Sequence, residues 1–549
     1  MTDHRPPAKR HCQSSILDLF LARCSIEDAI MNGNAKLVKE FLQLLRYPPK
    51  GKLLHLAIKS KQEEIAKILV EHGVDVSAKN EDLSSPLHSS IANGLISVTE
   101  MLIQKDANVQ ALDDKKNTPL HIAASKGCIK SVSALLDNGA KIHVKNKFGM
   151  TPLENAVKSG NHDIMVILLT ITESWQKPPD NFKLMLDSLL IMAARYAAPK
   201  EMILTLIALG ANPNLDFDQA LQSKIAIPAL SAALISERKD KKEIMEILIR
   251  NGANVNEKSF GGYARVRLAS GDGIHREYSL TEFTPLHYAA MFLTDDIDIL
   301  EMLTDNGADV DAQANYDCGT PLHHASEKLK SEKIVKFLVE HGANVNAITR
   351  DSETDNAEMI NLVMATPLHY ASLAGCFKTA KILIDSGANL TAKNKQSNTP
   401  LHLAVKNKNF WHGEFFNIKE LVPVQEALLD AGMETVKLLI NNGANLEATN
   451  DKKNTPLHNA ILEGYADVAE ILIQHGAKVN TQNKKFQSSL HMAVRNSSLK
   501  LGTKCIQILL QNRANLNIKD IRGETPLEIV LRKKIKPYIK TLLLQQHYL

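Results

Sequence analysis

Thr118-Pro119-Leu120-His121 is the stretch of sequence that decides the fold of this chain. Thr118 can cap the start of a helix, and Pro119 fits the first helical turn, where a missing N–H costs nothing. The same four residues recur, beginning at Thr284, Thr320, Thr366, Thr399 and Thr455. Weaker copies begin at Ser85, Thr151, Ser488 and Thr525. The sequence therefore predicts a helix that begins in the same way at many places along the chain.

The residues after Thr118 describe one complete structural unit. Leu120 and Ala123 lie on a small apolar face, and residues 131–136 provide a second apolar face at helical spacing. Gly139 supplies the left-handed residue that ends the second helix, and a hairpin tip is expected soon after it. A single unit cannot bury both of its helices, so the units are expected to stack.

The copies are evenly spaced along the N-terminal part of the chain. His55, His88, His121 and Glu154 follow one another at intervals of 33 residues. A 33-residue period that contains Thr-Pro-Leu-His is typical of ankyrin repeats, and the chain resembles this family from about residue 25 to its C-terminus. The resemblance implies an all-α fold, an ankyrin-repeat solenoid of stacked helix pairs with β-hairpin tips. We count about 13 units, several of them degenerate.

Length and composition agree with a repeat array. At 549 residues the chain is too long for one compact globule, and with 5% aromatic residues its core must consist of aliphatic side chains. The formal net charge of +4 is close to balance for this length, so bulk charge does not indicate a nucleic-acid partner. Composition therefore favours a stack of thin layers over a single large core.

Cysteine usage and hydropathy bear on location. The six cysteines are scattered without a C-x-x-C pair, which favours a reduced intracellular setting. No apolar run approaches the roughly 20 residues that span a bilayer, so no transmembrane segment is expected. We expect a cytoplasmic monomer. A nuclear location stays open because Lys9-Arg10 could belong to an import signal, and delivery into a host cell would apply to a secreted effector.

The organisation expected along the chain follows from where the repeat pattern holds and where it fails. It comprises a disordered arm at 1–24, repeats with an N-terminal cap at 25–171, a seam or bend at 172–182, repeats at 183–530, and a capping helix at 531–549. A loop variant that leaves the stack continuous is an equal alternative for the seam.

Three insertions interrupt the C-terminal repeats, at 258–282, 350–364 and 407–432. The first is rich in glycine, the second is acidic, and the third contains Phe410 and Trp411 in a chain with few aromatic residues. Insertions in repeat proteins lie on loops of one face and often contact partners. Tolerated surface loops are the alternative, since long loops cost little entropy.

No constellation of residues predicts chemistry. The repeated histidine of each phrase is expected to make structural hydrogen bonds, because histidines spread along a stack cannot converge on one ion. Cys318 with His323 and His324 has a loosely zinc-like spacing, but no second pair stands nearby. The chain contains no G-x-S-x-G and no H-E-x-x-H. We expect no catalytic residue, no metal, no cofactor and no enzyme activity.

What remains is a surface for binding. In the family that the chain resembles, partners contact the hairpin tips and the exposed side of each first helix. Basic residues recur at both places, and a few apolar residues join them: the candidate partner-binding residues are Lys115, Lys116, Lys126, Lys145, Lys147, Lys158, Met291, Phe292, Lys393, Lys395, Phe410, Trp411, Lys452, Lys453, Lys484 and Lys485. Further exposed positions expected on first helices are Lys59, Lys328, Lys406 and Arg495. We hypothesise a positive groove that attracts an acidic segment of a partner, with ordinary solubilising lysines as the alternative.

The sequence thus favours a non-enzymatic scaffold for protein–protein interaction, which binds through the concave face and the hairpin tips. The alternative is an adaptor or a secreted host-interacting effector that recruits a host or ubiquitin-machinery protein. Nucleic-acid binding is disfavoured, because it would need aromatic or arginine-rich tips, whereas these tips carry lysine and asparagine.

Overall fold

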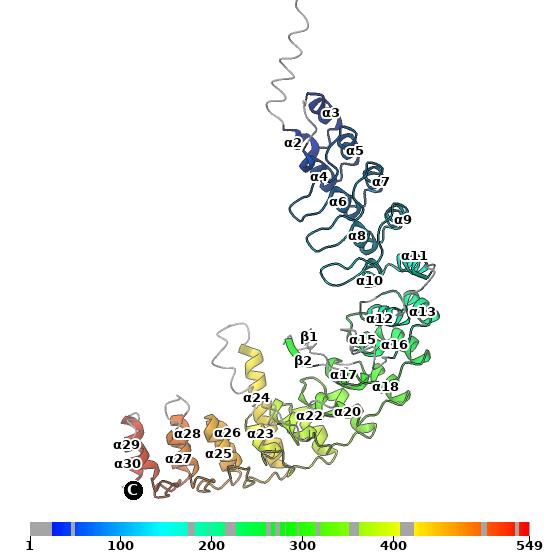
Figure 1. Ribbon diagram of the computed structural model, residues 1–549. Helices are drawn as coiled ribbons and strands as arrows, with labels where there is room; N and C mark the ends of the chain where they lie inside the picture. Colours follow the sequence, from blue (N-terminus) through cyan, green and yellow to red (C-terminus); the bar gives the residue numbers. More distant parts are fainter. Residues whose placement is uncertain are drawn as a thin grey trace, which may run out of the picture. The chain divides into compact units, whose positions relative to one another are not determined.

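The structure is a computed structural model that describes residues 25–44, 50–173, 182–196, 198–214, 227–259, 265–269, 275–279, 282–293, 296–314, 319–350, 362–406, 422–495, 502–532 and 537–547. Within these residues the chain forms successive pairs of short helices (Figure 1). A segment without helix, which includes a turn, leads from most pairs to the next.

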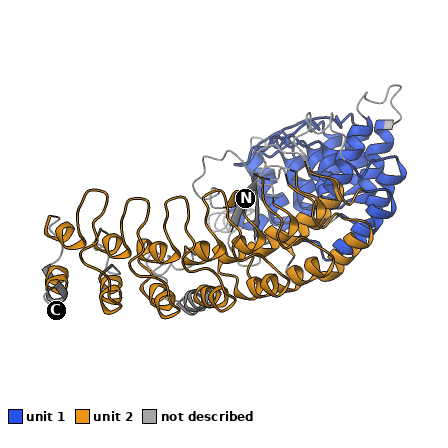
Figure 2. Ribbon diagram, turned by 90° about the horizontal axis from the view of Figure 1, so that it is seen from below, with its two compact units in different colours: residues 1–214, 236–253 blue, residues 215–235, 254–549 orange. Residues whose placement is uncertain are grey.

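The chain divides into two compact units, shown in different colours in Figure 2. Unit 1 comprises residues 1–214 and 236–253, and unit 2 comprises residues 215–235 and 254–549. Inside each unit the first helices of successive pairs pack on one another, and so do the second helices. Each unit is therefore an all-α stack with two helix layers, as the sequence predicts.

The helices of unit 1 are short and mostly come in pairs. They are α2 (Ile26–Met31), α3 (Ala35–Leu44), α4 (Gly51–Lys59), α5 (Glu63–Glu71), α6 (Pro86–Ala92), α7 (Ile96–Gln104), α8 (Pro119–Lys126), α9 (Ile129–Asp137), α10 (Pro152–Lys158), α11 (His162–Glu173), α12 (Phe182–Arg195), α13 (Lys200–Ala208) and α16 (Lys241–Arg250).

Unit 2 continues the same arrangement. Its elements are α15 (Ala229–Leu234), β1 (Arg265–Ala269), β2 (His275–Ser279), α17 (Pro285–Phe292), α18 (Ile297–Asp305), α19 (Pro321–Glu327), α20 (Glu332–Glu340), α21 (Pro367–Ala374), α22 (Phe377–Asp385), α23 (Pro400–Val405), α24 (Val422–Asn441), α25 (Pro456–Glu463), α26 (Ala466–Gln474), α27 (Ser489–Arg495), α28 (Gly502–Gln511), α29 (Pro526–Arg532) and α30 (Pro537–His547).

The predicted helix starts are confirmed. Thr118 is the N-cap of α8, Pro119 occupies the first turn, and His121 closes a capping box with the cap residue. The backbone N–H of Thr118 donates to Nδ1 of His121 at 3.1 Å, and the hydroxyl oxygen lies 2.8 Å from the same nitrogen. Gly139, with φ of 79°, follows the end of α9 in the left-handed region, as predicted.

The core of each unit consists of small and aliphatic side chains. In α8 the side chains of Leu120, Ala123 and Ala124 are fully buried, and Val132 and Leu135 of α9 are buried as well. Helix α8 packs on both α6 and α10. Because alanine leaves room for a neighbouring helix, the first helices can approach closely without leaving voids.

A buried arginine stabilises the divergent part of unit 1. Arg238 is 4% exposed and donates to the carbonyl of Ala198 at 2.9 Å and to those of Ala193 and Ala194 at 3.4 Å. Its charge is balanced by Asp240, at 2.7 Å. These carbonyls lie at and just beyond the C-terminal end of α12, where backbone carbonyls have no partner within the helix. Arg238 supplies the hydrogen-bond donor that they lack.

The insertions are described in part. Within 258–282, β1 and β2 pair antiparallel, with Arg265 opposite Ser279. Helix α24 covers the last part of 407–432 and continues into the second helix of its pair. The arm at 1–24, most of the seam predicted at 172–182, most of the acidic insertion, and residues 407–421 lie outside the described residues.

The end of the chain pairs α29 with α30. Ile539 and Leu543 of α30 are fully buried, whereas Tyr538 is 56% exposed. One face of α30 is thus covered and another faces water.

Candidate functional site

Seven of the tips between helix pairs are turns built around one side chain. In the tip 450–454, Oδ1 of Asn450 accepts the backbone N–H of Lys452 at 3.0 Å and that of Asn454 at 3.1 Å. The same two bonds recur at tips that begin at Asn80, Asp113, Asn146, Asn394, Asn483 and Asp520. An Asn or Asp side chain can mimic a backbone turn in this way, so these tips close without paired strands. The prediction of β-hairpin tips is therefore wrong for them: no strand is formed in these seven tips.

Neighbouring tips are joined to one another. The backbone N–H of Lys147 donates to the carbonyl of Lys115 at 2.8 Å, and that of Lys484 donates to the carbonyl of Lys452 at 2.9 Å. A second column of hydrogen bonds joins asparagine side chains beneath the tips. Nδ2 of Asn483 donates to Oδ1 of Asn454 at 3.0 Å, and equivalent bonds join Asn146 to Asn117 and Asn450 to Asn398. These contacts hold the tips from Asn80 to Met150 in register in unit 1, and those from Asn394 to Glu524 in unit 2.

The fourth residue of each of these tips has a left-handed backbone. Gly149 and Gly523 adopt φ of 76° and 75° there, which glycine tolerates without strain. At the same register position Lys116, Lys453 and Phe486 have φ of 57°, 53° and 56°. A side chain in this conformation costs roughly 1–2 kcal/mol, so these three residues occupy places where glycine would be more stable.

The repeated histidines are structural, as the sequence predicts. His458 is fully buried, and its Nε2 lies 3.3 Å from the carbonyl of Gln487 in the next tip, while the backbone N–H of Thr455 donates to Nδ1. Burial lowers the pKa of His369, His402 and His458 to about 4. A neutral ring with both nitrogens engaged is a poor base and a poor metal ligand, so these histidines carry no chemistry.

Most of the candidate lysines are exposed where the sequence places them. Those at the tips are Lys115, Lys116, Lys145, Lys147, Lys393, Lys395, Lys452, Lys453, Lys484 and Lys485, and those on the first helices are Lys126 and Lys158. The ammonium group of Lys158 also lies 5.1 Å from the ring centre of Tyr196.

Several other candidates are placed differently from expectation. Met291 is only 7% exposed because it faces the core of unit 2, so it cannot offer the predicted apolar spot, and Phe292 is half-buried. Lys328 donates to the carbonyl of Leu293 at 2.6 Å, and burial lowers the pKa of Lys406. Phe410 and Trp411 lie outside the described residues.

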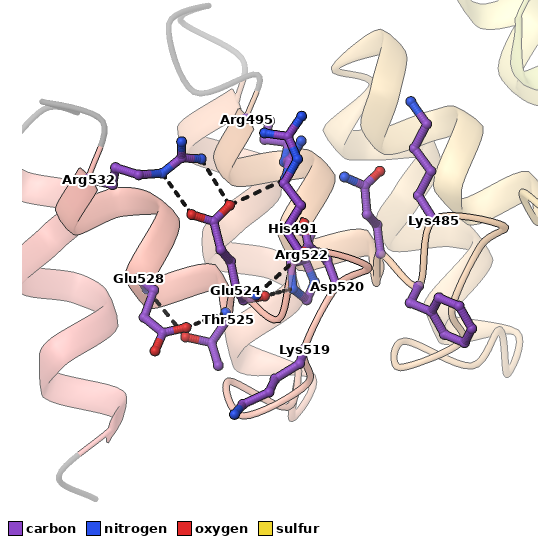
Figure 3. Close-up of polar contacts among 12 residues, drawn as sticks. Lys485, His491, Arg495, Lys519, Asp520, Arg522, Glu524, Thr525, Glu528 and Arg532 are labelled. Carbon is purple, nitrogen blue, oxygen red and sulfur yellow. Dashed lines mark hydrogen bonds and ion pairs between the residues drawn. The ribbon is translucent and has the colours of Figure 1, made fainter.

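Arg495 is also used within the fold. Its Nη2 lies 2.6 Å from Oδ2 of Asp520, whose side chain is fully buried, and Glu524 lies between Arg495 and Arg532 (Figure 3). The Arg532 Nε to Glu524 Oε1 distance is 2.7 Å. In Figure 3 the side chain of Lys485 extends away from this cluster. The carboxylates near the C-terminal tips are therefore paired internally, and the lysines face outward.

None of the His, Cys, Asp and Glu side chains in the described residues gather in a group of three that could hold a metal. A groove of about 810 Å³ runs along unit 1 between α4, α6 and the first tips, lined by residues of both charges that include Lys52, Lys59, Glu81 and Asp82. No helix in the described part of the chain is long and apolar enough to cross a membrane.

Comparison with family models identifies the repeats. Models described as ankyrin repeats match residues 26–113, 77–146, 107–178, 190–349, 368–411, 417–483 and 487–521. The chain belongs to the ankyrin-repeat family. Membership implies a scaffold for protein–protein interaction, and the matched models contribute no enzymatic domain.

Several curated proteins resemble this ankyrin-repeat protein over part of its length. A putative ankyrin repeat protein of fowlpox virus is 33% identical over 129 residues, which cover 20% of this chain and 19% of the relative. A second fowlpox protein of the same description is 24% identical over 40% of this chain and 57% of its own. The human ankyrin repeat and SOCS box protein 6 is 27% identical over 25% of this chain and 30% of its own.

The matched regions thus span less than two thirds of these relatives. Among solved structures, the ankyrin repeat domain of Bcl-3 is 24% identical with a TM-score of 0.36, and the match covers 48% of this chain and 98% of that domain.

Proposed function

We propose that this ankyrin-repeat protein is a non-enzymatic scaffold that captures partner proteins through its row of tips and the adjoining faces of its first helices. The observation that carries the proposal is the exposed lysine row, held in register by backbone bonds such as Lys484 N–H to Lys452 C=O at 2.9 Å. A rigid row of like charges attracts a segment of opposite charge and orients it before contact. The expected partner therefore has an acidic segment.

A second candidate function is that of an adaptor or host-interacting effector. The fowlpox relatives and the human SOCS box relative support this candidate through what their names say of those proteins. In this version the array would recruit a host protein or a component of the ubiquitin machinery. The proposed site of action is the cytoplasm, in either case as a monomer.

Affinity capture from a cell lysate, followed by mass spectrometry, tests both candidates. The full chain is compared with a variant in which Lys115, Lys116, Lys452 and Lys453 are changed to Glu. We expect the wild type to retain partner proteins at low salt and to lose them at high salt. The variant should fail to retain the same proteins. If the wild type captures no protein while the preparation turns over a substrate, the scaffold proposal is wrong.

A further inference from the structure

We propose that the four tips at the C-terminal end of unit 2 form a docking site for an acidic peptide segment that also carries a large apolar side chain. These tips span 394–398, 450–454, 483–487 and 520–524, and we call them the C-terminal tip row. The inference rests on the proposed scaffold function and names the chemistry of its partner. It is carried by the charge, the exposed apolar residues and the backbone of this row.

The charge of the C-terminal tip row is positive on its outer side. Its cationic residues are Lys395, Lys452, Lys453, Lys484, Lys485 and Arg522. Its acidic residues are Asp451, Asp520 and Glu524; the last two pair with arginines of the fold, whereas Asp451 is exposed, so six cations stand against one unpaired carboxylate. Asp451 accepts the hydroxyl of Ser397, Asp520 pairs with Arg495 at 2.6 Å, and Glu524 pairs with Arg532 at 2.7 Å. The field that reaches a partner is therefore basic.

The tips of unit 1 provide a contrast within the same chain. The tips 80–84, 113–117 and 146–150 carry Lys115, Lys116 and Lys147 together with Glu81, Asp82, Asp113 and Asp114. The two signs nearly cancel there. A uniform basic groove along the whole array, as the sequence suggested, is thus replaced by a row whose basic character is concentrated in unit 2.

Two large apolar side chains stand among these cations. Phe486 is 56% exposed and Ile521 is 64% exposed, each on a tip of the C-terminal tip row. The two tips are adjacent, because the backbone N–H of Ile521 donates to the carbonyl of Lys485 at 3.0 Å. An apolar side chain of a ligand could be covered by both, and each square ångström of apolar surface removed from water favours binding.

The backbone of the tip turn fixes where two side chains of this surface begin. Lys453 and Phe486 hold left-handed conformations, with φ of 53° and 56°, at the register position that Gly523 occupies on the next tip. Leu83, Lys116 and Ser397 share this left-handed conformation on other tips, so it belongs to the tip turn in general and not to this row alone. Here they place one ammonium group and one aromatic ring on the exposed side of neighbouring tips.

An acidic peptide fits this surface better than a nucleic acid. Binding to single strands relies on several aromatic platforms for successive bases, whereas the described tips of this row present one aromatic residue. Carboxylates spaced along an extended peptide can meet lysines on successive tips, and one apolar side chain can contact Phe486 and Ile521. An oligonucleotide therefore serves as a competing probe.

The test measures binding of the full chain to four probes by fluorescence anisotropy. These are a short fluorescein-labelled peptide of Asp and Glu with one central Phe, the same peptide with Ser in place of Phe, a neutral peptide of equal length, and a single-stranded oligonucleotide. The variants are K452E/K453E/K484E/K485E in unit 2, the matched K115E/K116E/K145E/K147E in unit 1, and F486G, which relieves strain while removing the ring. Circular dichroism confirms that each variant remains folded.

We expect the unit 2 reversal to weaken binding of the Phe-containing peptide by about tenfold or more, and the unit 1 reversal to change it by less than about twofold. F486G should weaken binding of the Phe peptide by several-fold and leave the Ser peptide unchanged. Equal losses from the two reversals, or tighter binding of the oligonucleotide than of the Phe peptide, would overturn the inference.

The scaffold function has its own readout. If the wild type captures partner proteins that the unit 2 reversal still retains, the docking site is wrong while the scaffold function stands. If the wild type captures no protein, the scaffold function itself fails.

Discussion

His369 is hydrogen-bonded to Asn398 of the next repeat. Its Nε2 lies 3.0 Å from the backbone carbonyl oxygen of Asn398. On the other side of the ring, Nδ1 accepts the backbone N–H of Thr366 at 3.1 Å. The ring must therefore carry its proton on Nε2, so that it donates to one repeat and accepts from its own. One side chain thus caps its own helix and joins neighbouring repeats. The predictions about stability that follow depend on this geometry.

Replacing His369 by Ala should lower the stability of unit 2 by about 1–3 kcal/mol, because the buried carbonyl of Asn398 then loses its donor. The change is measured as a lower midpoint of thermal or urea unfolding, and as faster amide exchange in α21. Lys381→Ala on the exposed side of α22 is the control, with an expected change within about 0.5 kcal/mol. Equal effects of the two substitutions would contradict this role.

Acid should destabilise the array. Burial holds the pKa of His369, His402 and His458 at about 4, against an ordinary value of 6.5. Between these pH values the unfolded chain binds protons that the folded chain does not, so the stabilisation is complete above pH 6.5 and is lost as the pH falls toward 4. Each histidine contributes at most roughly 3 kcal/mol to this loss.

A single substitution tests the cause of this pH dependence. His458→Gln keeps a residue that can close a capping box but cannot titrate. Its melting temperature should fall less steeply than that of the wild type as the pH is lowered through this window. Parallel curves for the two proteins would show that the buried histidines do not cause the acid sensitivity.

The left-handed tips predict an unusual response to glycine. Lys453→Gly should leave the stability unchanged or raise it by up to about 1 kcal/mol, because glycine relieves the strain at φ of 53°. Lys453→Val should lower it by about 1–2 kcal/mol, since a β-branched residue fits this conformation poorly. The melting temperatures of the two variants, each compared with the wild type, measure these changes in stability. A stable glycine variant that binds its partner more weakly would show why the lysine is retained.

Arg238 should be essential to unit 1. Arg238→Met leaves carbonyls near the end of α12, such as that of Ala198, without their donor, and we expect a loss of about 2–4 kcal/mol. Limited proteolysis and amide exchange over residues 182–198 report the change. The neighbouring exposed Lys239→Ala is the matched control. Unaltered protection in Arg238→Met would mean that water replaces the guanidinium at no cost.

The helix starts and the family follow from local sequence signals. A Thr cap, a first-turn Pro and a His three residues after the cap act within one helical turn, so the phrase at Thr118 predicts the same geometry wherever it recurs. The small apolar faces and the period of 33 residues then require stacking. The exposure of tip lysines such as Lys452 was also predictable, since a turn at the edge of a stack faces water.

The candidate site could be predicted only in part, because charge and burial at a surface depend on residues from other repeats. Nothing local in the sequence distinguishes Arg495, paired with the buried carboxylate of Asp520, from an exposed lysine on another first helix. Met291 reads as an apolar surface residue until the neighbouring helices that bury it are known. The register position shared by Lys453, Phe486 and Gly523 was visible in the sequence, but its strain was not.

The sequence by itself therefore determined the repeating unit, its helix starts, its tips and its family, because these depend on contacts within one or two turns of chain. The tertiary structure decided which charges face outward. Packing one repeat on the next pairs Asp520 with Arg495 and leaves the lysines of the C-terminal tip row facing solvent. Which charges face solvent depends on distances between residues of different repeats, and the linear sequence does not contain these distances.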